Sequence, residues 1–336
     1  MPLVCVLGSG IIGLASAEAL VDAGYDVVVA ARDLPGDPPG LSWASPSAGA
    51  VIYPTHSPEA QSQEFEAETF KHYWTLAHQD PTSGAQIVPV TEFFQDPSKS
   101  DSQAWYMKVN PFHRHLRSDE LPQGVNAGIT VTSVAVNPLI YLPYLQKKLE
   151  RLGTKFIRLT ATSFKEVLRA TGADILINAT GLGAGKLCND GAVVPIRGQA
   201  MFLRDRADWN QILLCQDDAY TYVIPRLGSG GVLFGGIRQD GNETESPDPS
   251  LRSDILRRVN RISKGAFADV DLDTDVEDLV GFRPGRKGGY RLEIDGGRSD
   301  LVHAYGFDGV GYVCSVGVGK RVVGLVGQLV GQKAKL

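Results

Sequence analysis

The glycine-rich stretch near the start of the chain most constrains its fold. An apolar run at residues 4–7 leads into Gly8-Ser9-Gly10-Ile11-Ile12-Gly13, and residues 14–23 continue with apolar side chains at helical spacing. This order predicts a strand, a tight turn and a helix. Gly8 permits the turn, Gly10 lets the backbone approach a pyrophosphate, and Gly13 lets the helix pack closely on the strand. The free N–H groups at the start of such a helix favour a bound phosphate.

A second strand and an acidic residue complete the pattern. Residues 26–31 form another apolar run that ends in Arg32 and Asp33. Asp33 stands 20 residues after Gly13, where an acidic side chain can bind the ribose of an adenine dinucleotide. The first 33 residues therefore predict a βαβ unit of the Rossmann type.

Length and composition limit the remaining possibilities. A chain of 336 residues is long for one hydrophobic core, so we expect two domains. The net charge of −5, without a basic cluster, argues against a nucleic-acid partner. The four cysteines are far apart and do not pair with the six histidines at metal-binding spacing, so we expect a reducing compartment and no metal. No apolar run reaches the length of a membrane span, and we expect no membrane partner.

The rest of the chain predicts a second, mainly antiparallel domain inserted into the first. Helices are expected at 64–77, 137–152, 251–263 and 320–329, and strands at 155–159, 175–179, 195–203, 221–225, 231–237 and 300–305, with further strands within 85–106. A strand over 279–290 should be broken at Arg283-Pro284-Gly285, and 306–317 should be a loop.

This order predicts a discontinuous α/β fold. A Rossmann-type dinucleotide domain would comprise 1–50, 141–194 and 278–336. An antiparallel-sheet, α+β substrate domain would comprise 51–140 and 195–277. Such interruption of the nucleotide domain is typical of flavin oxidoreductases rather than of simple dehydrogenases.

Six separated motifs resemble the D-amino-acid oxidase family. They occur in the same order as in the family, and their residues are most similar to those of fungal members. They are residues 4–13 with Ala31-Arg32-Asp33, Ser42-Trp43-Ala44-Ser45-Pro46, Asn178-Ala179-Thr180-Gly181, Tyr222-Val223-Ile224-Pro225-Arg226, Gly281-Phe282-Arg283-Pro284 and His303-Ala304-Tyr305-Gly306. The resemblance implies FAD as cofactor and hydride transfer from the α-carbon of a D-amino acid to flavin N5. The imino acid would hydrolyse to a 2-oxo acid and ammonia, and O₂ would give H₂O₂. No side chain is expected to act as acid or base, because the cofactor carries the chemistry.

The resemblance also implies roles for individual residues at the substrate. Arg283 should bind the α-carboxylate with its planar fork, and Tyr222 should hydrogen-bond the same group. The carbonyl of Gly309 should accept from the substrate amine. Tyr53 and His56 follow the flavin loop and are candidates for substrate contact, although a lone loop histidine is more often solvated.

The resemblance also implies a larger set of residues in contact with the cofactor. It consists of Gly8, Ser9, Gly10, Ile11, Ile12, Gly13, Arg32, Asp33, Ser45, Ala48, Gly49, Ala50, Ala161, Thr180, Gly181, Arg283, Gly309, Gly311, Tyr312 and Val313.

One position bears on the substrate. Gly235-Gly236-Ile237-Arg238-Gln239 resembles the D-aspartate oxidase branch, in which this arginine meets the side-chain carboxylate of the substrate. D-Aspartate is therefore the expected substrate. In the alternative, Arg238 turns outward or pairs with Asp217, Asp218 or Asp240, and the enzyme oxidises neutral D-amino acids.

The C-terminal residues Ala334-Lys335-Leu336 differ by one residue from the peroxisomal signal Ser-Lys-Leu. With the family resemblance, they predict a peroxisomal matrix location and binding to the import receptor. We expect a homo-oligomer, with an assembly unlike that of fungal relatives that carry a long insertion where this chain has only 293–299. A nicotinamide dehydrogenase and a non-catalytic nucleotide-binding protein remain as alternative functions.

Overall fold

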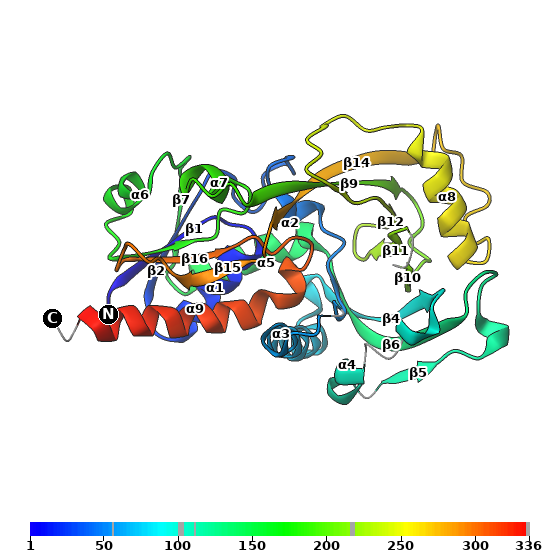
Figure 1. Cartoon of the computed structure of the whole chain (residues 1–336), viewed down its shortest axis with the longest axis horizontal. Coiled ribbons are helices and arrows are strands. Elements are labelled where there is room, and N and C mark those ends of the chain that lie inside the picture. The colour runs from blue at the N-terminus through cyan, green and yellow to red at the C-terminus, as the bar shows by residue number, and fades with distance from the viewer. Residues whose placement is uncertain (56, 100–103, 111, 216–218, 334–336) are drawn as a thin grey trace.

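The structure is a computed structural model that describes residues 1–55, 57–99, 104–110, 112–215 and 219–333, and two β-sheets organise it (Figure 1). The first sheet has the strand order β15-β16-β8-β1-β2-β7, and only β15 within this order runs antiparallel to its neighbour. Its strands are β1 (Leu3–Leu7), β2 (Asp26–Ala31), β7 (Lys155–Arg158), β8 (Ile175–Asn178), β15 (Arg291–Ile294) and β16 (Leu301–Tyr305). The expected α/β class with a Rossmann-type sheet is confirmed.

Helices cover both faces of this parallel sheet, which explains why its strands are continuous apolar runs. Val4 and Val6 of β1 lie in a cluster with buried residues of α1 (Ile11–Asp22) and α9 (Gly311–Lys333). Cys5 and Leu7 point the other way. They lie in a second cluster with Val167 of α6 (Phe164–Thr171), and the short helix α7 (Gly183–Leu187) follows β8.

The second sheet has the order β13-β9-β12-β11-β10-β4-β6-β3, with β14 paired to β9 and β5 to β6. Its pairs are antiparallel except β10 with β4. The strands are β3 (Val51–Ile52), β4 (Ala85–Phe94), β5 (His113–His115), β6 (Ala127–Val136), β9 (Val193–Leu203), β10 (Ile212–Cys215), β11 (Thr221–Arg226), β12 (Gly231–Gly235), β13 (Gln239–Asp240) and β14 (Val276–Arg286). The expected antiparallel substrate-domain sheet is therefore confirmed.

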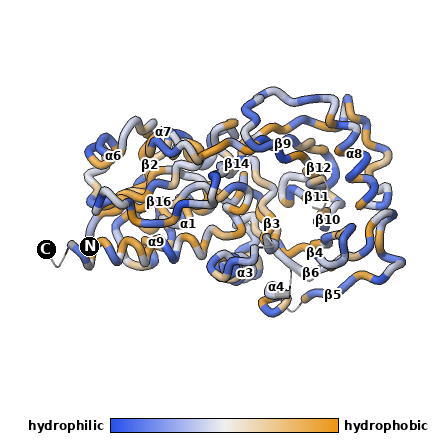
Figure 2. Tube along the Cα trace, in the orientation of Figure 1, coloured by the Kyte–Doolittle hydropathy of each residue, from blue (hydrophilic) through white to orange (hydrophobic). Residues whose placement is uncertain are grey.

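Helices cover this second sheet as well. Helix α8 (Leu251–Ile262) packs on β10, β11 and β12, and α3 (Ala60–Gln79) packs on β4 and β6 and also on α9. Figure 2 shows hydrophobic residues along the strands of both sheets and along α9, whereas much of α3 and α8 is hydrophilic. The remaining helical segments are α2 (Ala44–Ser47), η1 (Pro81–Ser83), α4 (Ala104–Val109) and η3 (Ser118–Glu120).

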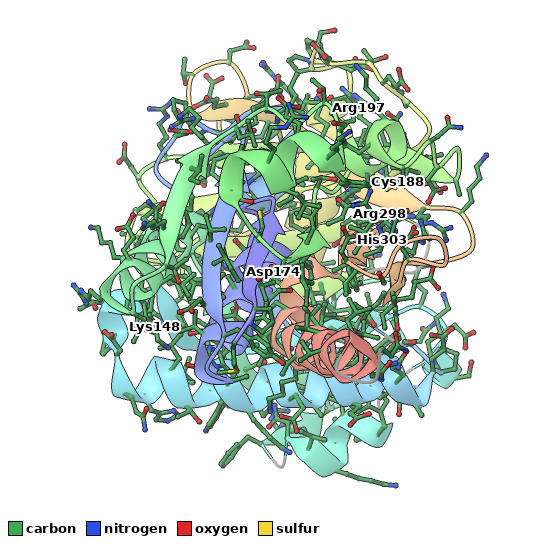
Figure 3. All side chains as sticks on the ribbon, turned by 90° about the vertical axis from the view of Figure 1, so that its left-hand side faces the viewer. Lys148, Asp174, Cys188, Arg197, Arg298 and His303 are labelled. Atoms are coloured by element: carbon green, nitrogen blue, oxygen red, sulfur yellow. The ribbon has the colours of Figure 1, made fainter. Side chains whose placement is uncertain are left out.

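Helix α5 (Pro138–Arg151) agrees with the expected helix at 137–152 and joins the two parts of the fold. The side chain of Asn137 accepts from the N–H of Leu139 at 3.1 Å, and Pro138 occupies the first turn, as helix starts favour. Lys148 near its end donates to Glu18 of α1 at 2.6 Å. Figure 3 shows Lys148 at the flank of the parallel sheet, seen from the end of the molecule that carries this sheet.

The predicted boundary of the last helix was wrong. Residues from Gly311 onward are helical, so most of the expected loop at 306–317 belongs to α9. Two glycines of this helix allow other helices to pack closely on it. A Cβ on Gly317 would lie 2.3 Å from Phe65 Cα of α3, and one on Gly319 would lie 2.6 Å from the carbonyl oxygen of Ala15 in α1.

This boundary also changes what the sequence says about membranes. Within the described residues, Gly311–Gln332 forms one helix that is long and apolar enough to cross a membrane by length and composition alone. Buried positions make up 56% of its apolar window, and α9 packs on α1 and α3. Core helices of this length have the same composition, so the helix is weak evidence for a membrane span.

The predicted break in the strand at Arg283-Pro284-Gly285 was also wrong. Strand β14 pairs with β9 without interruption from Val276 to Arg286, and Pro284 lies opposite Pro195. Within the described residues, β14 pairs with β9 alone, and such an edge tolerates a proline that lacks an N–H. The division into domains remains a prediction; β14, assigned by it to the dinucleotide domain, pairs with the second sheet.

Two further segments differ from expectation. Strands were expected within 85–106, but β4 ends at Phe94 and helix α4 begins at Ala104. The segment between β2 and Tyr53 is rich in proline, glycine, serine and alanine, as loops often are, but it contains α2 and β3.

Candidate active site

A cavity of about 910 Å³ extends from the C-terminal end of β2 to the antiparallel sheet. Its wall includes the expected residues Gly8, Ser9, Gly10, Ile11, Ile12, Arg32, Asp33, Ser45, Ala48, Gly49, Ala50, Tyr53, Ala161, Thr180, Gly181, Tyr222, Arg238, Arg283, Gly309, Gly311, Tyr312 and Val313. Gly13 is not part of the wall, and His56 lies outside the described residues. The individual contacts with cofactor and substrate remain predictions, but the cavity brings nearly all of the proposed residues together.

The glycine turn forms a cradle that fits the pyrophosphate of FAD. Gly8 has a φ of +114°, and a Cβ there would lie 2.4 Å from the carbonyl oxygen of Ala179. A Cβ on Gly13 would lie 1.9 Å from the carbonyl oxygen of Gly8, so this glycine is required for the helix to meet the turn. Gly10 is the N-cap of α1 and has no side chain to cap the helix, so N–H groups of the first turn beyond Ile11 can face an anion.

Polar side chains hold the two loops beside this cradle. The N–H of Ile11 donates to Ser45 Oγ at 2.9 Å, which fixes the start of α1 against α2. Ser9 Oγ donates to the carbonyl oxygen of Asp33. The Asp33 carboxylate accepts from Arg32 at 2.5 and 2.8 Å, and it stands at the cavity wall where the ribose contact was predicted.

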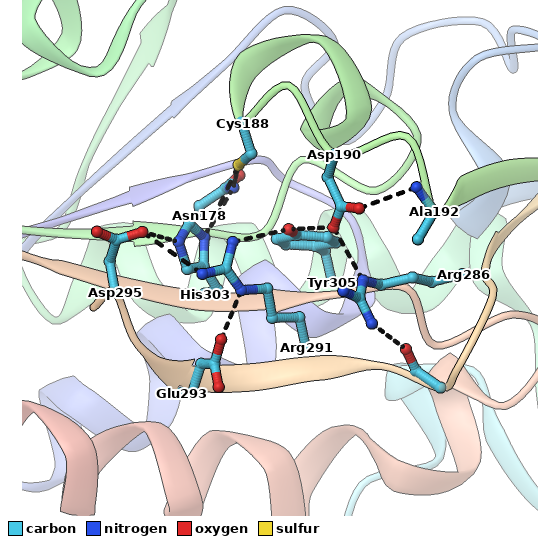
Figure 4. A network of polar contacts seen from close by, with 11 residues as sticks. Asn178, Cys188, Asp190, Ala192, Arg286, Arg291, Glu293, Asp295, His303 and Tyr305 are labelled. Atoms are coloured by element: carbon cyan, nitrogen blue, oxygen red, sulfur yellow. Dashed lines mark hydrogen bonds and ion pairs between the residues drawn. The ribbon is translucent and has the colours of Figure 1, made fainter. Parts of the chain in front are cut away.

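Thr180 at the cavity wall is joined to a network of polar contacts, and Figure 4 shows the part of this network that includes Asn178, His303 and Asp295. Thr180 Oγ1 donates to Asn178 Oδ1 at 2.7 Å, and Asn178 Nδ2 donates to Cys188 Sγ at 3.1 Å and approaches His303 Nδ1 at 3.3 Å. His303 Nε2 lies 2.9 Å from Asp295 Oδ2. Burial lowers the pKa of His303 although Asp295 opposes the effect, so the neutral ring accepts from Asn178 and donates to Asp295. Burial raises the pKa of Cys188, which keeps it a thiol.

The same network continues to the end of β14. Tyr305 Oη donates to Asp190 Oδ2 at 2.8 Å, and Arg286 Nε donates to the same oxygen at 2.9 Å. The hydrogen bond from Arg286 lowers the pKa of Asp190 to about 2. These contacts fix β14 against β16 on the side of the cavity where Thr180 and Tyr305 stand.

Arg283 is the cation that the cavity leaves without a counter-charge. Its Nη1 is buried and has no hydrogen-bond partner within the described part of the chain. Its Cζ lies 5.6 Å from the ring centroid of Tyr220. A Cβ on Gly198 of β9 would lie 2.8 Å from Nη1, so glycine makes room for the guanidinium. Arg283 is half-buried as a residue, but the buried Nη1 lacks the partner that a charged group needs, and its position suits a ligand that brings an anion.

Tyr222 projects from β11 into the same end of the cavity. It lies opposite Gly235 of β12, where a Cβ would approach the ring to 1.8 Å, so the ring requires this glycine. The residue is 7% exposed, and burial raises its pKa to about 12. The hydroxyl therefore remains protonated and can donate a hydrogen bond to a carboxylate.

Arg238 lines the cavity but already has partners. Its Nη1 lies 2.8 Å from Asp308 Oδ2, and its Nε lies 3.1 Å from Asp240 Oδ1. The side chain is 46% exposed. Pairing with Asp240 was the alternative to a substrate contact; Asp217 and Asp218 lie outside the described residues.

Sequence reasoning missed two residues at this end. Tyr220 stands two positions before Tyr222, a spacing that places alternate side chains on one face and could have identified it. Asp308 gave no signal, because its partner Arg238 is 70 positions away in the chain. Among the described residues, no group of three or more His, Cys, Asp or Glu side chains could hold a metal ion.

Comparisons with known proteins agree with this cavity. The model of the FAD dependent oxidoreductase family (DAO) matches residues 4–325. The D-amino-acid oxidase of Schizosaccharomyces pombe is 30% identical, over 94% of this chain and 93% of that enzyme. The D-aspartate oxidase of Talaromyces thermophilus is 29% identical, over 97% of this chain and 95% of that enzyme.

A solved structure supports the fold. The iminodiacetate oxidase of Chelativorans sp. BNC1 superimposes with a TM-score of 0.75 at 18% identity, covering 97% of this chain and 95% of that one. The matched family, the glycine cradle and the open helix start agree on one cofactor, which is FAD. The chain belongs to the D-amino-acid oxidase family of FAD-dependent oxidoreductases.

Proposed function

We propose that this protein oxidatively deaminates D-amino acids with uncharged side chains to 2-oxo acids, ammonia and H₂O₂. The observation that carries the proposal is the buried Nη1 of Arg283, which has no partner in the described part of a cavity built for FAD. An α-carboxylate supplies the missing anion, and the paired geometry of a guanidinium suits it. The S. pombe relative is a D-amino-acid oxidase, which supports the same class of reaction for this protein.

The side chains around Arg283 would orient the rest of the substrate. Tyr222, kept protonated by its raised pKa, donates to the carboxylate beside Arg283. The carbonyl of Gly309 accepts from the amine, and a Cβ on Gly309 would lie 3.3 Å from Arg283 Cδ, so the two groups are neighbours. FAD, when bound, would supply the hydride acceptor for the α-hydrogen and the site at which O₂ is reduced. The contribution of the protein is to hold carboxylate and amine in one orientation.

D-Aspartate is the second candidate substrate. The D-aspartate oxidase of T. thermophilus and the presence of Arg238 in the cavity wall favour it. Against it, Arg238 is paired with Asp308 and Asp240, so this group of three carries one more negative than positive charge. An acidic side chain would therefore approach an arginine whose charge is already balanced, whereas a neutral side chain requires no partner. This charge balance favours neutral substrates.

The location and assembly are proposals on separate grounds. The tail Ala334-Lys335-Leu336 supports peroxisomal import, and it lies outside the described residues. A homo-oligomer is proposed from the family resemblance alone.

An H₂O₂ assay over a panel of D- and L-amino acids tests the proposal. We expect turnover of D-alanine and other neutral D-amino acids, less turnover of D-aspartate, and none of L-alanine. Preference for D-aspartate would reject the neutral assignment but keep the reaction class. Turnover of no D-amino acid by the FAD-loaded protein would reject both.

A further inference from the structure

The partner of Arg238 inside the cavity wall is Asp308, a residue to which no role has so far been assigned. Two contacts join them: Arg238 Nη1 donates to Asp308 Oδ1 at 3.0 Å and lies 2.8 Å from Oδ2. Both residues line the cavity, whereas Asp240, the second partner of Arg238, does not belong to its wall. Asp308 is 31% exposed and Asp240 is 65% exposed, so water screens Asp308 less.

The backbone holds Asp308 next to the substrate-binding residues. Its N–H donates to the carbonyl oxygen of Pro284 at 2.9 Å, one residue after Arg283 in β14. It also directly precedes Gly309, whose carbonyl is proposed to accept from the substrate amine. The backbone of Asp308 is therefore held beside β14 at Arg283.

The side chain of Tyr220 links the charges at this end of the cavity. Tyr220 lines the cavity with Arg238, Asp308 and Arg283, although the residue is 36% exposed. It lies against both Arg283 and Tyr222, with ring centroids 5.2 Å apart in the second pair. Because Arg238 Nη1 lies 2.8 Å from Asp308 Oδ2, a side-chain carboxylate of a substrate that reaches Arg238 also meets Asp308.

We propose that Asp308 determines side-chain preference by occupying Arg238 with an internal carboxylate, so that the cavity disfavours acidic substrates. The proposal rests on the proposed function and names the residue that sets its substrate class. An acidic side chain must displace Asp308 from Arg238 and then remain beside an unpaired carboxylate. Removing that carboxylate releases the guanidinium and removes the repulsion in one step.

Asp308→Asn is the informative variant. Asp308 has a φ of +51°, a conformation that asparagine adopts more readily than most residues, so the loop should keep its path. The measured quantity is the ratio of kcat/KM for D-aspartate to kcat/KM for D-alanine. Because the pair is partly exposed, we expect this ratio to rise roughly three- to fivefold.

Asp240→Asn is the matched control. It removes the same charge and another partner of Arg238, but outside the cavity wall, so the ratio should change less than it does in Asp308→Asn. In an Arg238→Gln background the effect of Asp308→Asn should shrink, because no guanidinium is left to release. A ratio that Asp308→Asn leaves within twofold of the wild-type value overturns the proposal, as does a wild type that prefers D-aspartate.

A binding measurement separates this proposal from the proposed reaction. Succinate and butyrate have the same four-carbon length and differ by one carboxylate, and their Kd values follow from the change in flavin absorbance of the FAD-loaded protein. We expect Asp308→Asn to lower the ratio of the succinate Kd to the butyrate Kd, and Asp240→Asn to lower it less. An unchanged Kd ratio contradicts the role of Asp308. If the ratio falls but no D-amino acid is oxidised, the charge assignment holds and the proposed reaction fails.

Discussion

Replacement of Arg283 by methionine should separate substrate binding from stability. The side chain keeps its apolar length and loses its charge, so the α-carboxylate loses a paired, charge-assisted contact. Removing one partner of such a buried pair costs about 2–5 kcal/mol. Since about 1.4 kcal/mol corresponds to tenfold, kcat/KM should fall roughly 30- to several-thousand-fold for every D-amino acid, because all present the same carboxylate.

The same variant should not destabilise the protein. Nη1 of Arg283 is buried and has no hydrogen-bond partner within the described residues, so methionine leaves no protein acceptor unpaired there and gives up only the contact of the guanidinium with the Tyr220 ring. We expect the Tm of the FAD-loaded variant to equal or exceed that of the wild type. Arg283→Lys keeps the charge but loses the planar fork, so its kcat/KM should lie between that of the wild type and that of Arg283→Met. Turnover of D-alanine by Arg283→Met within threefold of the wild type would refute the assignment, and a lower Tm would show that Arg283 has a structural partner.

Three other perturbations test separate parts of the structure. Gly10→Val should yield colourless protein, because the valine side chain would enter the phosphate cradle. A Cβ at Gly10 would already lie 3.0 Å from Ser45 Oγ. A fully yellow variant would contradict this placement of the pyrophosphate. Burial lowers the pKa of His303, so the unfolded state binds the proton more readily, and the Tm should fall as pH drops below the unfolded value of about 6.5. His303→Gln should make this dependence shallower but not abolish it, because the pKa of His72 is also lowered by burial; an unchanged slope would exclude His303 as a source. A fluorescent protein ending in this tail should enter peroxisomes and become cytosolic without Leu336; a cytosolic pattern with the intact tail would remove the localisation proposal.

The features that the sequence predicted best are those whose cause lies within a few residues along the chain. Gly8 and Gly13 have local causes, a turn with positive φ and a close approach, and both appear in the structure as expected. Helix α5 was predictable for the same reason, since Asn137 and Pro138 mark its start within three residues.

The errors arose where distant segments determine the local structure. Residues 306–317 were expected to form a loop, but α9 begins at Gly311, and α3 packs closely on the backbone of Gly317 within this helix. Pro284 was taken as a strand break, but it is tolerated because β14 pairs with β9 on one side. The contact of Arg238 with Asp308 also joins distant segments, and the sequence around neither residue predicts it.

Reduction of the bound flavin without oxygen shows whether this protein oxidises D-amino acids. The FAD-loaded protein is mixed anaerobically with D-alanine or with L-alanine, and the oxidised-flavin absorbance is followed in each case. We expect bleaching by D-alanine, no bleaching by L-alanine, and a large loss of the D-alanine rate in Arg283→Met. Flavin that no D-amino acid bleaches, or that both enantiomers bleach equally, would contradict this expectation.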